Sequence, residues 1–411
     1  MLSPLTTPNF PGDTINRVST NFPIPYSPQL RTAILCLGGL GGSGKVATEL
    51  ARGLANFGTK VLLLTSPQAE WVCKNEESSF SYLPVNAPKS PTVADFNWVK
   101  PLAQEIIQHI ETHNIAVLNV HYAVGLVEAA LLARQELAKR DYNFSVCLTL
   151  HGSDVTKFGY DPDYAPQLRN AIIACDEVTA VSHWLADEAV KIFDLEKRPT
   201  VIHNAIDLKF FHPFRRWIAV PSKTLSLCHI SNLRDVKRPL DAITVLARVI
   251  GAGVPARLLM IGDGPNLEKA RKHARKLGLV NEVMFLGASS PNEVVRWLAV
   301  SDLQLVTSES ESFCLAALES MACEVPVVGT FCGGLEEVMG ILDADMPNKL
   351  LSAPGDTTTM ATKIVQLFNS PSTYQGIRDS LREKIKQSFS DSEKLEAYAK
   401  LFSTLQSEVS R

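Results

Sequence analysis

The chain has 411 residues, of which 45% are hydrophobic and 20% charged, and its formal net charge at pH 7 is −3. This composition is typical of a globular protein with two or three domains. The near-neutral charge, without a block of lysine or arginine, argues against nucleic acid or an anionic membrane as a partner.

Two features bear on location. No apolar run reaches the ~18 residues of a membrane span, and the first residues, MLSPLTTPNF, lack the basic and apolar regions of a secretory signal. The eight cysteines are scattered without a Cys-x-x-Cys pair. We therefore expect a cytoplasmic protein with buried thiols.

Residues 1–30 are rich in proline, threonine and asparagine and lack periodicity, which predicts a flexible N-terminal extension. From residue 31 strands and helices alternate. An apolar run at 33–37 predicts a strand, the glycine-rich stretch 38–44 a loop, and 45–57 a helix with one apolar face. Further strands in this series are predicted at 61–65, 116–120, 146–150, 178–181 and 200–203.

Residues 206–221 interrupt this rhythm and predict a linker. A second series follows, with strands predicted at 225–230, 257–262, 283–286, 303–306 and 326–329, and with Asp356 capping a helix that ends at residue 368. Runs that are apolar on both faces predict parallel sheets covered by helices.

We therefore predict an α/β protein of two doubly wound, Rossmann-like domains that face a cleft. The first domain is 31–205 and the second is 222–385, and a C-terminal helix at 386–411 is expected to pack back on the first domain. In such sheets ligands bind beyond the carboxyl ends of the strands.

The glycine loop GGLGGSG at 38–44 nearly matches a phosphate-binding P-loop, because Gly39, Gly44 and Lys45 have its spacing. Val46 stands where that motif needs a hydroxyl for Mg²⁺, which argues against a nucleoside triphosphatase. A glycine-rich turn between a strand and a helix still suits a phosphate group through its backbone N–H groups, and a plain tight turn is the alternative.

Two histidines end neighbouring predicted strands. His151 precedes Gly152 after the strand at 146–150, and His121 precedes Tyr122 at the end of the strand before it. Loops after parallel strands meet at one edge of the sheet, so we expect these two loops to lie together. The pattern alone leaves two roles open for His151, a structural one and ligand binding.

In the second domain, HISNLRDVKR at 229–238 leaves a predicted strand and carries Arg234, Lys237 and Arg238. A cluster of charged residues usually forms a solvated face. Because this cluster lies in a loop between a strand and a helix, we expect it instead to bind a diphosphate. The GDGP turn at 262–265 lies at the same edge and is expected to be mainly structural.

The segment VTSESESFCLAALESMACEVPVVGTFCGGLEEV at 306–338 holds Glu311 and Glu319, with seven residues between them. Its middle, 313–321, predicts a helix that has Glu311 just before it and Glu319 about two turns inside. The N–H groups of the first helical turn suit a diphosphate. Acids that flank a helix are by themselves a weak indication, because most are solvated.

This string resembles the Glu-x7-Glu signature of retaining GT-B glycosyltransferases of family 4, and the resemblance covers about residues 31–400. It implies a GT-B fold in which Glu311 meets the hydroxyls of a donor hexose and Glu319 meets the ribose. Cys314 and Glu324 stand where the family usually has glycine. The Cβ of Cys314 narrows the approach of the backbone to the donor.

Two Asp-x-Asp pairs match the metal motif of the other major glycosyltransferase fold; they are Asp161-Pro162-Asp163 and Asp343-Ala344-Asp345. Neither follows a convincing buried strand, so we expect both to be turn acids. We accordingly expect no metal ion and no cofactor, with the nucleotide sugar acting as a substrate.

Within family 4 the chain resembles the N-acetylglucosaminyl-L-malate synthases of bacillithiol biosynthesis. The matching strings are GGSG, VHYAV, TLHGSD, TAVS, HISNLRDVKR and GDGP, together with the Glu311 region. HISN is the most telling, because most of family 4 has Gly-Arg where Ser231 and Asn232 stand. Residues 38–40 depart from the subfamily, which bears on the acceptor more than on the donor.

The resemblance implies a role for each matching residue. Glu311, Lys237 and His151 would form the catalytic centre, with Lys237 on the diphosphate and His151 on the donor sugar. The donor would also be bound by Gly41, Gly42, Asn232, Arg234, Phe313, Cys314, Leu315 and Glu319. The acceptor, a dicarboxylate, would be bound by Ser43, Tyr122, Thr149 and Arg169.

The activity implied is transfer of N-acetylglucosamine from UDP-N-acetylglucosamine to the hydroxyl of L-malate, with retention. A family 4 transferase with another acceptor, such as a sugar or a lipid-linked glycan, is the alternative. A non-catalytic nucleotide-sugar binder is a third class, and the presence of both glutamates, His151 and Lys237 argues against it. A homo-oligomer is compatible with the sequence.

Overall fold

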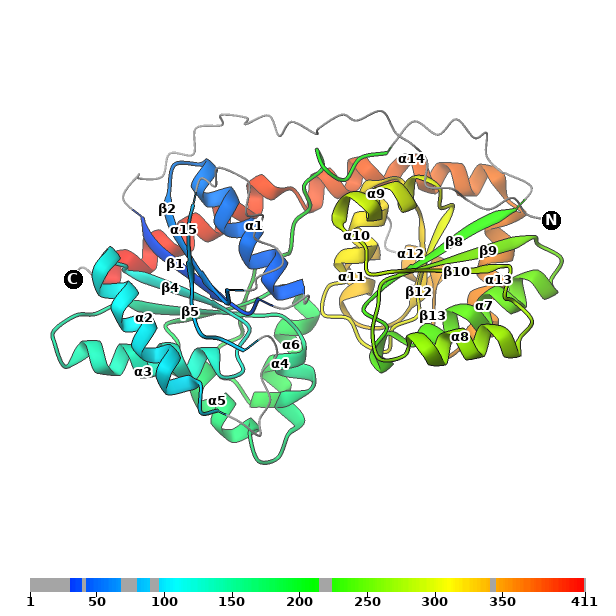
Figure 1. Ribbon diagram of the computed structural model, residues 1–411. Coiled ribbons are helices and arrows are strands. Elements are labelled where there is room, and N and C mark those ends of the chain that lie inside the picture. Colours follow the sequence, from blue (N-terminus) through cyan, green and yellow to red (C-terminus); the bar gives the residue numbers. More distant parts are fainter. Residues whose placement is uncertain are drawn as a thin grey trace. The chain divides into compact units, whose positions relative to one another are not determined.

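The computed structural model describes residues 30–38, 42–67, 80–88, 96–213, 224–340 and 345–409, and the chain forms two compact units (Figure 1). The C-terminal unit is Ile206–Ser390. The N-terminal unit combines the described residues of 30–205 with 391–409. The predicted extension up to residue 29 and the linker stretch 214–221 lie outside the described residues.

The N-terminal unit is built on a seven-stranded sheet in the order β3-β2-β1-β4-β5-β6-β7, and its pairings are parallel. The strands are β1 (Arg31–Cys36), β2 (Lys60–Thr65), β3 (Ser81–Pro84), β4 (Val117–His121), β5 (Ser145–Leu150), β6 (Glu177–Ala180) and β7 (Thr200–Val201). The helices are α1 (Gly42–Asn56), α2 (Val99–His113), α3 (Leu126–Ala138), α4 (Ser153–Thr156), α5 (Ala165–Ile173) and α6 (His183–Phe193). The strands β1, β2, β4 and β5 are almost wholly buried, as a parallel sheet covered by helices requires.

Helix α15 (Asp391–Val409) completes the core of the N-terminal unit. Its residues Leu395, Tyr398 and Phe402 belong to the same buried cluster as the first strands of the sheet. Gly53 of α1 makes this packing possible, because a Cβ at that position would lie 2.4 Å from a methyl carbon of Leu395. The two helices can therefore approach closely.

The direction of α15 follows from two hydrogen bonds near its end. The Arg31 N–H donates to Gln406 Oε1 at 2.9 Å, and the Ser145 hydroxyl donates to the Leu405 carbonyl at 3.3 Å. Arg31 and Ser145 are the first residues of β1 and β5. Helix α15 thus runs antiparallel to the strands, and its first turns lie at their carboxyl ends, where ligands bind in such folds.

The C-terminal unit has a six-stranded sheet in the order β10-β9-β8-β11-β12-β13, again with parallel pairing. The strands are β8 (Leu225–Ile230), β9 (Ala256–Ile261), β10 (Val283–Gly287), β11 (Leu303–Val306), β12 (Val327–Thr330) and β13 (Leu351–Ser352). The helices are α7 (Pro239–Gly251), α8 (Leu267–Lys276), α9 (Pro291–Ala299), α10 (Leu315–Ala322), α11 (Gly334–Gly340), α12 (Met346–Leu350), α13 (Thr357–Phe368) and α14 (Pro371–Ser388). The predicted cap of α13 is confirmed, since the Asp356 side chain accepts from the Thr359 N–H at 3.0 Å.

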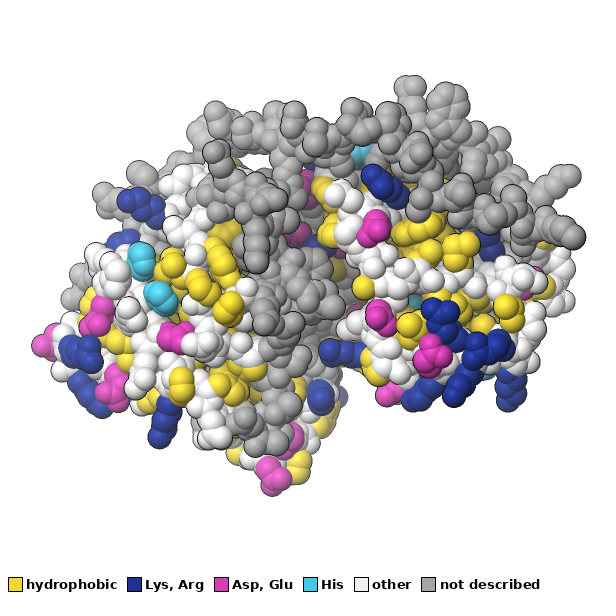
Figure 2. Space-filling view, viewed as in Figure 1, with side chains coloured by type: hydrophobic (Ala, Val, Ile, Leu, Met, Phe, Trp, Pro, Cys, Tyr) yellow, Lys and Arg dark blue, Asp and Glu magenta, His cyan; other side chains and the backbone are white. Residues whose placement is uncertain are grey.

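Helix α8 has five lysine or arginine residues within positions 269–276, so the statement that the sequence lacks a basic block was wrong for this helix. Figure 2 shows lysine and arginine side chains gathered over this part of the C-terminal unit. Arg271 stacks over the ring of Phe285 at 4.8 Å from its centroid, while Lys272 is exposed.

Among the described residues, no helix combines the length and the apolar character that a membrane span requires.

Candidate active site

Each sheet reverses its strand order at one point, and ligands of such folds bind at the carboxyl ends of the strands there. The reversal falls between β8 and β11 in the C-terminal unit and between β1 and β4 in the N-terminal unit. Lys237 follows β8, Glu311 follows β11, and His121 ends β4. These three residues therefore fall where each fold positions ligands.

Lys237 and Glu311 form a partly buried ion pair. The Lys237 Nζ lies 2.7 Å from both carboxylate oxygens of Glu311, and the Ser308 hydroxyl donates to one of them at 2.6 Å. Burial by itself would lower the pKa of Lys237, but the Glu311 carboxylate outweighs it and holds that pKa above its usual value. The side chain thus remains an ammonium, held in place by charge-assisted hydrogen bonds.

The loops that carry this pair are bonded to each other. The Thr307 hydroxyl lies 2.9 Å from the Lys237 carbonyl and 3.0 Å from the Arg238 carbonyl, and donates to this pair of acceptors. The Glu309 N–H donates to the Val236 carbonyl at 2.8 Å. The basic loop and the glutamate loop consequently form one rigid surface.

The GDGP turn supports the basic loop, as predicted. A Cβ at Gly262 would lie 1.8 Å from the Ser231 carbonyl oxygen, and one at Gly264 would lie 1.9 Å from that of Asn232. The Asn266 side chain also donates to Asp235 at 2.9 Å. Only glycine allows the turn to approach this closely, so its role is to hold the loop.

The other two arginines of the basic loop differ in environment. Arg234 is exposed. Arg238 forms an ion pair with Asp241 at 2.7 Å and lies 3.8 Å from Glu309. Of the three basic residues in this loop, Lys237 is the one that pairs with Glu311.

Helix α10 begins at Leu315, two residues later than predicted, because Cys314 has a left-handed φ of 70°. Glu324 has a φ of 60°. These are the two positions where the family has glycine, and left-handed backbone costs other residues about 1–2 kcal/mol each. Glu319 therefore lies just over one turn inside α10 rather than two, and it is 8% exposed.

The side chains of Phe313 and Cys314 are buried, and Phe313 packs edge-on against Phe389 with 5.3 Å between ring centroids. These residues and Leu315 can therefore offer a ligand their backbone N–H groups rather than their side chains. The loop before them is fixed by Glu311, whose N–H donates to the Cys332 carbonyl at 2.8 Å and whose carbonyl accepts from Gly334 at 2.7 Å.

In the N-terminal unit the two predicted histidines meet. His121 Nδ1 lies 2.9 Å from His151 Nε2, and His121 Nε2 lies 2.7 Å from Asn119 Oδ1. The Asn119 amide nitrogen donates to the Cys147 carbonyl at 3.2 Å and to the Thr149 hydroxyl at 3.0 Å. Because the Asn119 nitrogen is the donor in these two bonds, the atom that faces His121 is the Asn119 Oδ1 oxygen, which can only accept. Nε2 of His121 therefore carries a proton.

This network sets the tautomers of both rings. Because neutral His121 has its proton on Nε2, its Nδ1 accepts from Nε2 of His151. His151 then has its lone pair on Nδ1, which is a hydrogen-bond acceptor for a hydroxyl group. Burial, followed by the charge of Lys394, lowers the pKa of His151 to about 3, and burial lowers that of His121 well below its usual value. Both imidazoles are therefore neutral at physiological pH.

Buried neutral histidines make stability depend on pH. In the unfolded chain His151 binds a proton as the pH falls below about 6.5, whereas folded His151 has a pKa of about 3 and stays neutral. Acidification therefore favours the unfolded state, and the free energy of unfolding decreases. At pH 5 the loss is about 2 kcal/mol for such a histidine. We expect the fall in Tm from pH 7 to pH 5 to be smaller in His151→Asn than in the parent. Exposed His113→Asn is the control, and equal falls in all three proteins would contradict the assignment.

The structure brings Tyr122 and Thr149 together with His151. The Tyr122 N–H donates to the Thr149 carbonyl at 3.1 Å, and its hydroxyl lies 2.9 Å from the hydroxyl of Ser153. The Thr149 hydroxyl is fully buried and lies 2.9 Å from that of Thr179. Thr149 thus supports the loops. Ser43 and Gly42 lie in the first turn of α1, and Gly41 lies outside the described residues.

Arg169 does not join this group in the contacts that the structure shows. Its guanidinium donates to the Phe193 carbonyl at 2.6 Å and to the Asp194 carbonyl at 3.1 Å, at the end of α6. It lines a cavity of about 370 Å³ with Glu177 and Pro199, which lie at the amino ends of β6 and β7. The role implied for Arg169 stays a prediction, and these contacts favour a structural role.

Sequence reasoning gave no role to Asp154, which ties the two histidine loops together. Its carboxylate is fully buried and accepts from the N–H groups of His151, Gly152 and Ala123. Burial raises its pKa. The TLHGSD string contained this signal, because an acid four residues after a strand end is well placed to accept from the turn before it.

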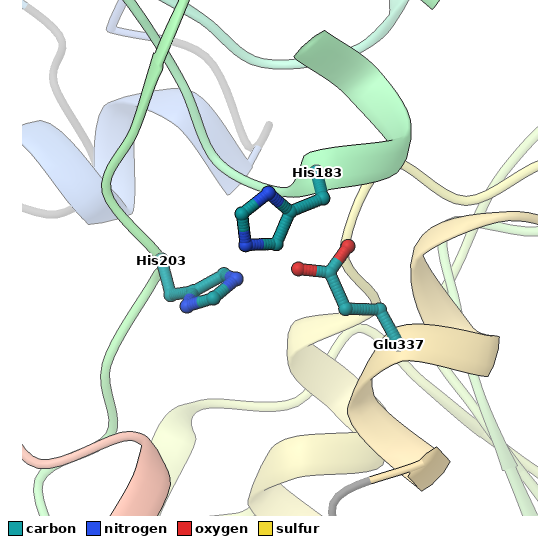
Figure 3. A group of neighbouring side chains, drawn as sticks. All are labelled: His183, His203 and Glu337. Carbon is teal, nitrogen blue, oxygen red and sulfur yellow. The ribbon is translucent and has the colours of Figure 1, made fainter. Parts of the chain in front are cut away.

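Two more histidines of this unit lie near each other. His183 begins α6 and His203 follows β7, with ring centroids 5.4 Å apart and planes at 74° (Figure 3). Glu337, also labelled there, belongs to α11 of the C-terminal unit. The Ser182 side chain caps α6 by accepting from the Leu185 N–H at 3.0 Å, which positions His183 at the start of the helix.

The prediction that Asp161 is a turn acid is confirmed. Its carboxylate accepts from the N–H groups of Asp163 and Tyr164, both at 3.1 Å, just before α5. In the second Asp-x-Asp pair, Asp343 and Ala344 lie outside the described residues, and Asp345 precedes α12.

Two parallel, doubly wound units with their polar residues at the switch points define a GT-B glycosyltransferase fold, and solved structures agree. A sucrose-phosphate synthase from Thermosynechococcus elongatus superposes with a TM-score of 0.76 at 18% identity, covering 92% of this chain and 100% of that one. Anabaena HepE in complex with UDP-glucose has a TM-score of 0.73 at 19% identity, covering 91% and 99%. These structures confirm the predicted fold class.

Sequence comparison gives the family. The Glycosyltransferase Family 4 model matches residues 40–210, and the model for glycosyl transferases group 1 matches residues 213–388. An N-acetyl-alpha-D-glucosaminyl L-malate synthase of Bacillus anthracis is 32% identical over 391 residues, covering 91% of this chain and 97% of the relative. A D-inositol 3-phosphate glycosyltransferase of Catenulispora acidiphila is 26% identical over 259 residues, covering 57% and 60%. The chain belongs to the family 4 glycosyltransferases.

Proposed function

We propose that this glycosyltransferase transfers N-acetylglucosamine from UDP-N-acetylglucosamine to the hydroxyl of L-malate, with retention of the anomeric configuration. The observation that carries the proposal is the likeness to the Bacillus anthracis synthase along almost the full length of both chains. The strings that carry this likeness fall on loops at the carboxyl ends of the strands, the edge where such folds bind ligands.

On the donor side, Lys237 would contact the diphosphate and stabilise the charge that develops as it leaves. Glu311, whose carboxylate is oriented by Lys237 and Ser308, would accept hydrogen bonds from the hexose hydroxyls. Glu319 would bind the ribose, and the N–H groups at the start of α10 would complete the site. Gly41, Gly42, Asn232 and Arg234 would add contacts to the nucleotide sugar.

In the reaction the malate oxygen forms a bond to the anomeric carbon while the bond from that carbon to the phosphate oxygen breaks. The hydroxyl proton goes to the departing diphosphate, on the same face of the sugar. His151, neutral and with its lone pair on Nδ1, would accept a hydrogen bond from the donor sugar near this carbon. The proposal includes no metal ion and no cofactor. The Asp-x-Asp pair at Asp161, which resembles a metal motif, forms a turn in which the Asp161 carboxylate accepts from backbone N–H groups.

Ser43 and Tyr122 would contribute to the acceptor site, with Thr149 holding the loop that carries Tyr122. Arg169 is left out of this proposal, because its guanidinium is bonded to the end of α6. A family 4 transferase with another acceptor is the second candidate. The similarity to a D-inositol 3-phosphate glycosyltransferase favours keeping it, because that relative has a different named acceptor.

UDP release from UDP-N-acetylglucosamine tests the proposal. We expect L-malate to accelerate release at least about tenfold, equally with and without EDTA, and lactate, which lacks the second carboxylate, to have little effect. Acceleration by a sugar or an inositol phosphate but not by malate would support the second candidate. Loss of activity in EDTA that Mg²⁺ or Mn²⁺ restores would show that a metal ion takes part.

A further inference from the structure

Lys394 is a buried cation at the carboxyl edge of the N-terminal sheet. It lies on α15 one turn before Tyr398, whose hydroxyl is 3.4 Å from that of Thr149 in β5. Because α15 runs antiparallel to the strands, one turn towards its start leads past Thr149 to the strand ends. His151 directly follows β5 there, so Lys394 faces the histidine loops.

The environment of Lys394 supports this placement. Its positive charge contributes to the lowered pKa of both His151 and His121, after burial in each case. Its own pKa is lowered by burial, an effect that Asp391 and Glu49 partly offset and Lys45 reinforces. The ammonium therefore lies among the two imidazoles, the start of α15 and the helix that follows the glycine loop.

Within the part of the chain that the structure describes, the ammonium has no bonded counter-ion. The residue is 7% exposed, and neither a hydrogen bond nor an ion pair joins it to any residue that the structure describes. Burying a charge without a partner is unfavourable, and buried charges in proteins are normally paired. An anionic ligand would supply the missing partner. Asp391 and Glu49 act on it only through space.

We propose that Lys394 binds a carboxylate of the acceptor substrate at the carboxyl edge of the N-terminal unit. The inference rests on the proposed function. An acceptor with two carboxylates calls for cationic partners in this unit, and the Arg169 guanidinium is bonded to the end of α6. In the proposed function the donor diphosphate is bound by Lys237 of the C-terminal unit. We therefore assign the acceptor carboxylate, rather than the diphosphate, to Lys394.

Lys394→Met removes the charge and keeps the length of the side chain. We expect the KM for L-malate to rise at least tenfold while the KM for UDP-N-acetylglucosamine changes less than about twofold. Lys400→Met, an exposed lysine on the same helix, is the matched control and should change neither. Lys394→Arg, which keeps the charge, should recover part of the loss. A rise confined to the donor KM would overturn the inference, and so would an unchanged malate KM.

A thermal-shift experiment separates this inference from the proposed function. We expect L-malate to raise the Tm of the parent and of Lys400→Met above that in NaCl of equal ionic strength, and to leave Lys394→Met unchanged. If malate accelerates UDP release but Lys394→Met behaves like the parent, only the inference fails. If malate has no effect in either assay, the proposed function fails, and other dicarboxylates and inorganic phosphate are compared in the same way. The inference is overturned if no anion gives a shift that Lys394→Met removes.

Discussion

Replacing Lys237 by alanine is expected to lower kcat/KM for the nucleotide sugar by about 10²–10³. Two effects contribute. The developing charge on the departing diphosphate loses its ammonium partner, and Glu311 loses the cation that lies 2.7 Å from both of its carboxylate oxygens. Steady-state kinetics with UDP release as the readout measure the change, and Lys272→Ala on the exposed face of α8 is the control.

A double-mutant cycle with Glu311→Gln separates these effects. If Lys237 acts mainly by orienting Glu311, the two substitutions together will cost little more than either alone. If it acts mainly on the diphosphate, the loss in the double variant will approach the sum of the two free-energy changes. Unchanged kinetics in Lys237→Ala would refute a catalytic role for the ion pair.

Gly334→Ala is expected to reduce both activity and stability. The added Cβ would lie 2.3 Å from the Ser312 carbonyl oxygen and 2.6 Å from the Phe313 nitrogen, and backbone atoms cannot move aside as a flexible side chain can. The loop between Glu311 and Cys314 must shift, and a displacement of about 1 Å in a site can cost about 10² in rate. We also expect a loss of stability of about 1–3 kcal/mol from overpacking.

Gly340→Ala provides the control within the same helix. A Cβ at Gly340 would meet no atom of the described residues within 4 Å, so activity and Tm should stay close to those of the parent. Kinetics and thermal unfolding of both variants test the argument. If Gly334→Ala and Gly340→Ala behave alike, the close approach of α11 to the glutamate loop does not matter for the site.

Apolar runs bounded by glycine and charged residues predicted most of the fold. The strands at 225–230 and 303–306 have the predicted bounds, because each is a short buried run in a parallel sheet. Two edge strands escaped prediction. Strand β3 consists of SYLP with its outer residues exposed, and β13 has two residues, so neither has an apolar run to detect.

The sequence predicted which residues belong to the candidate site, but it did not predict the contacts between them. The string HISNLRDVKR does not predict the ion pair between Lys237 and Glu311. This contact depends on the short 3-10 helix Asp235–Lys237 and on the left-handed φ of 46° at Arg238. The late start of α10 depends on the backbone of Cys314, which its residue type disfavours.

Lys394 illustrates a signal that was present in the sequence. Together with Tyr398, Phe402 and Leu405 it follows the spacing of one helix face, so a charge stands in line with apolar residues. Such a pattern indicates a buried cation. The prediction of a C-terminal helix that packs back on the first domain did not single out this charge.

The split composition of the N-terminal unit has a consequence for biosynthesis. Residues 391–409 leave the ribosome only after the whole of Ile206–Ser390, yet Leu395, Tyr398 and Phe402 are part of the core around the first strands. The nascent sheet therefore waits with an uncovered apolar surface while some 185 intervening residues are translated, a state that calls for chaperone protection. The C-terminal unit, continuous in sequence, has no such delay. We therefore expect the N-terminal unit, although it is made first, to complete its core after the C-terminal unit has folded.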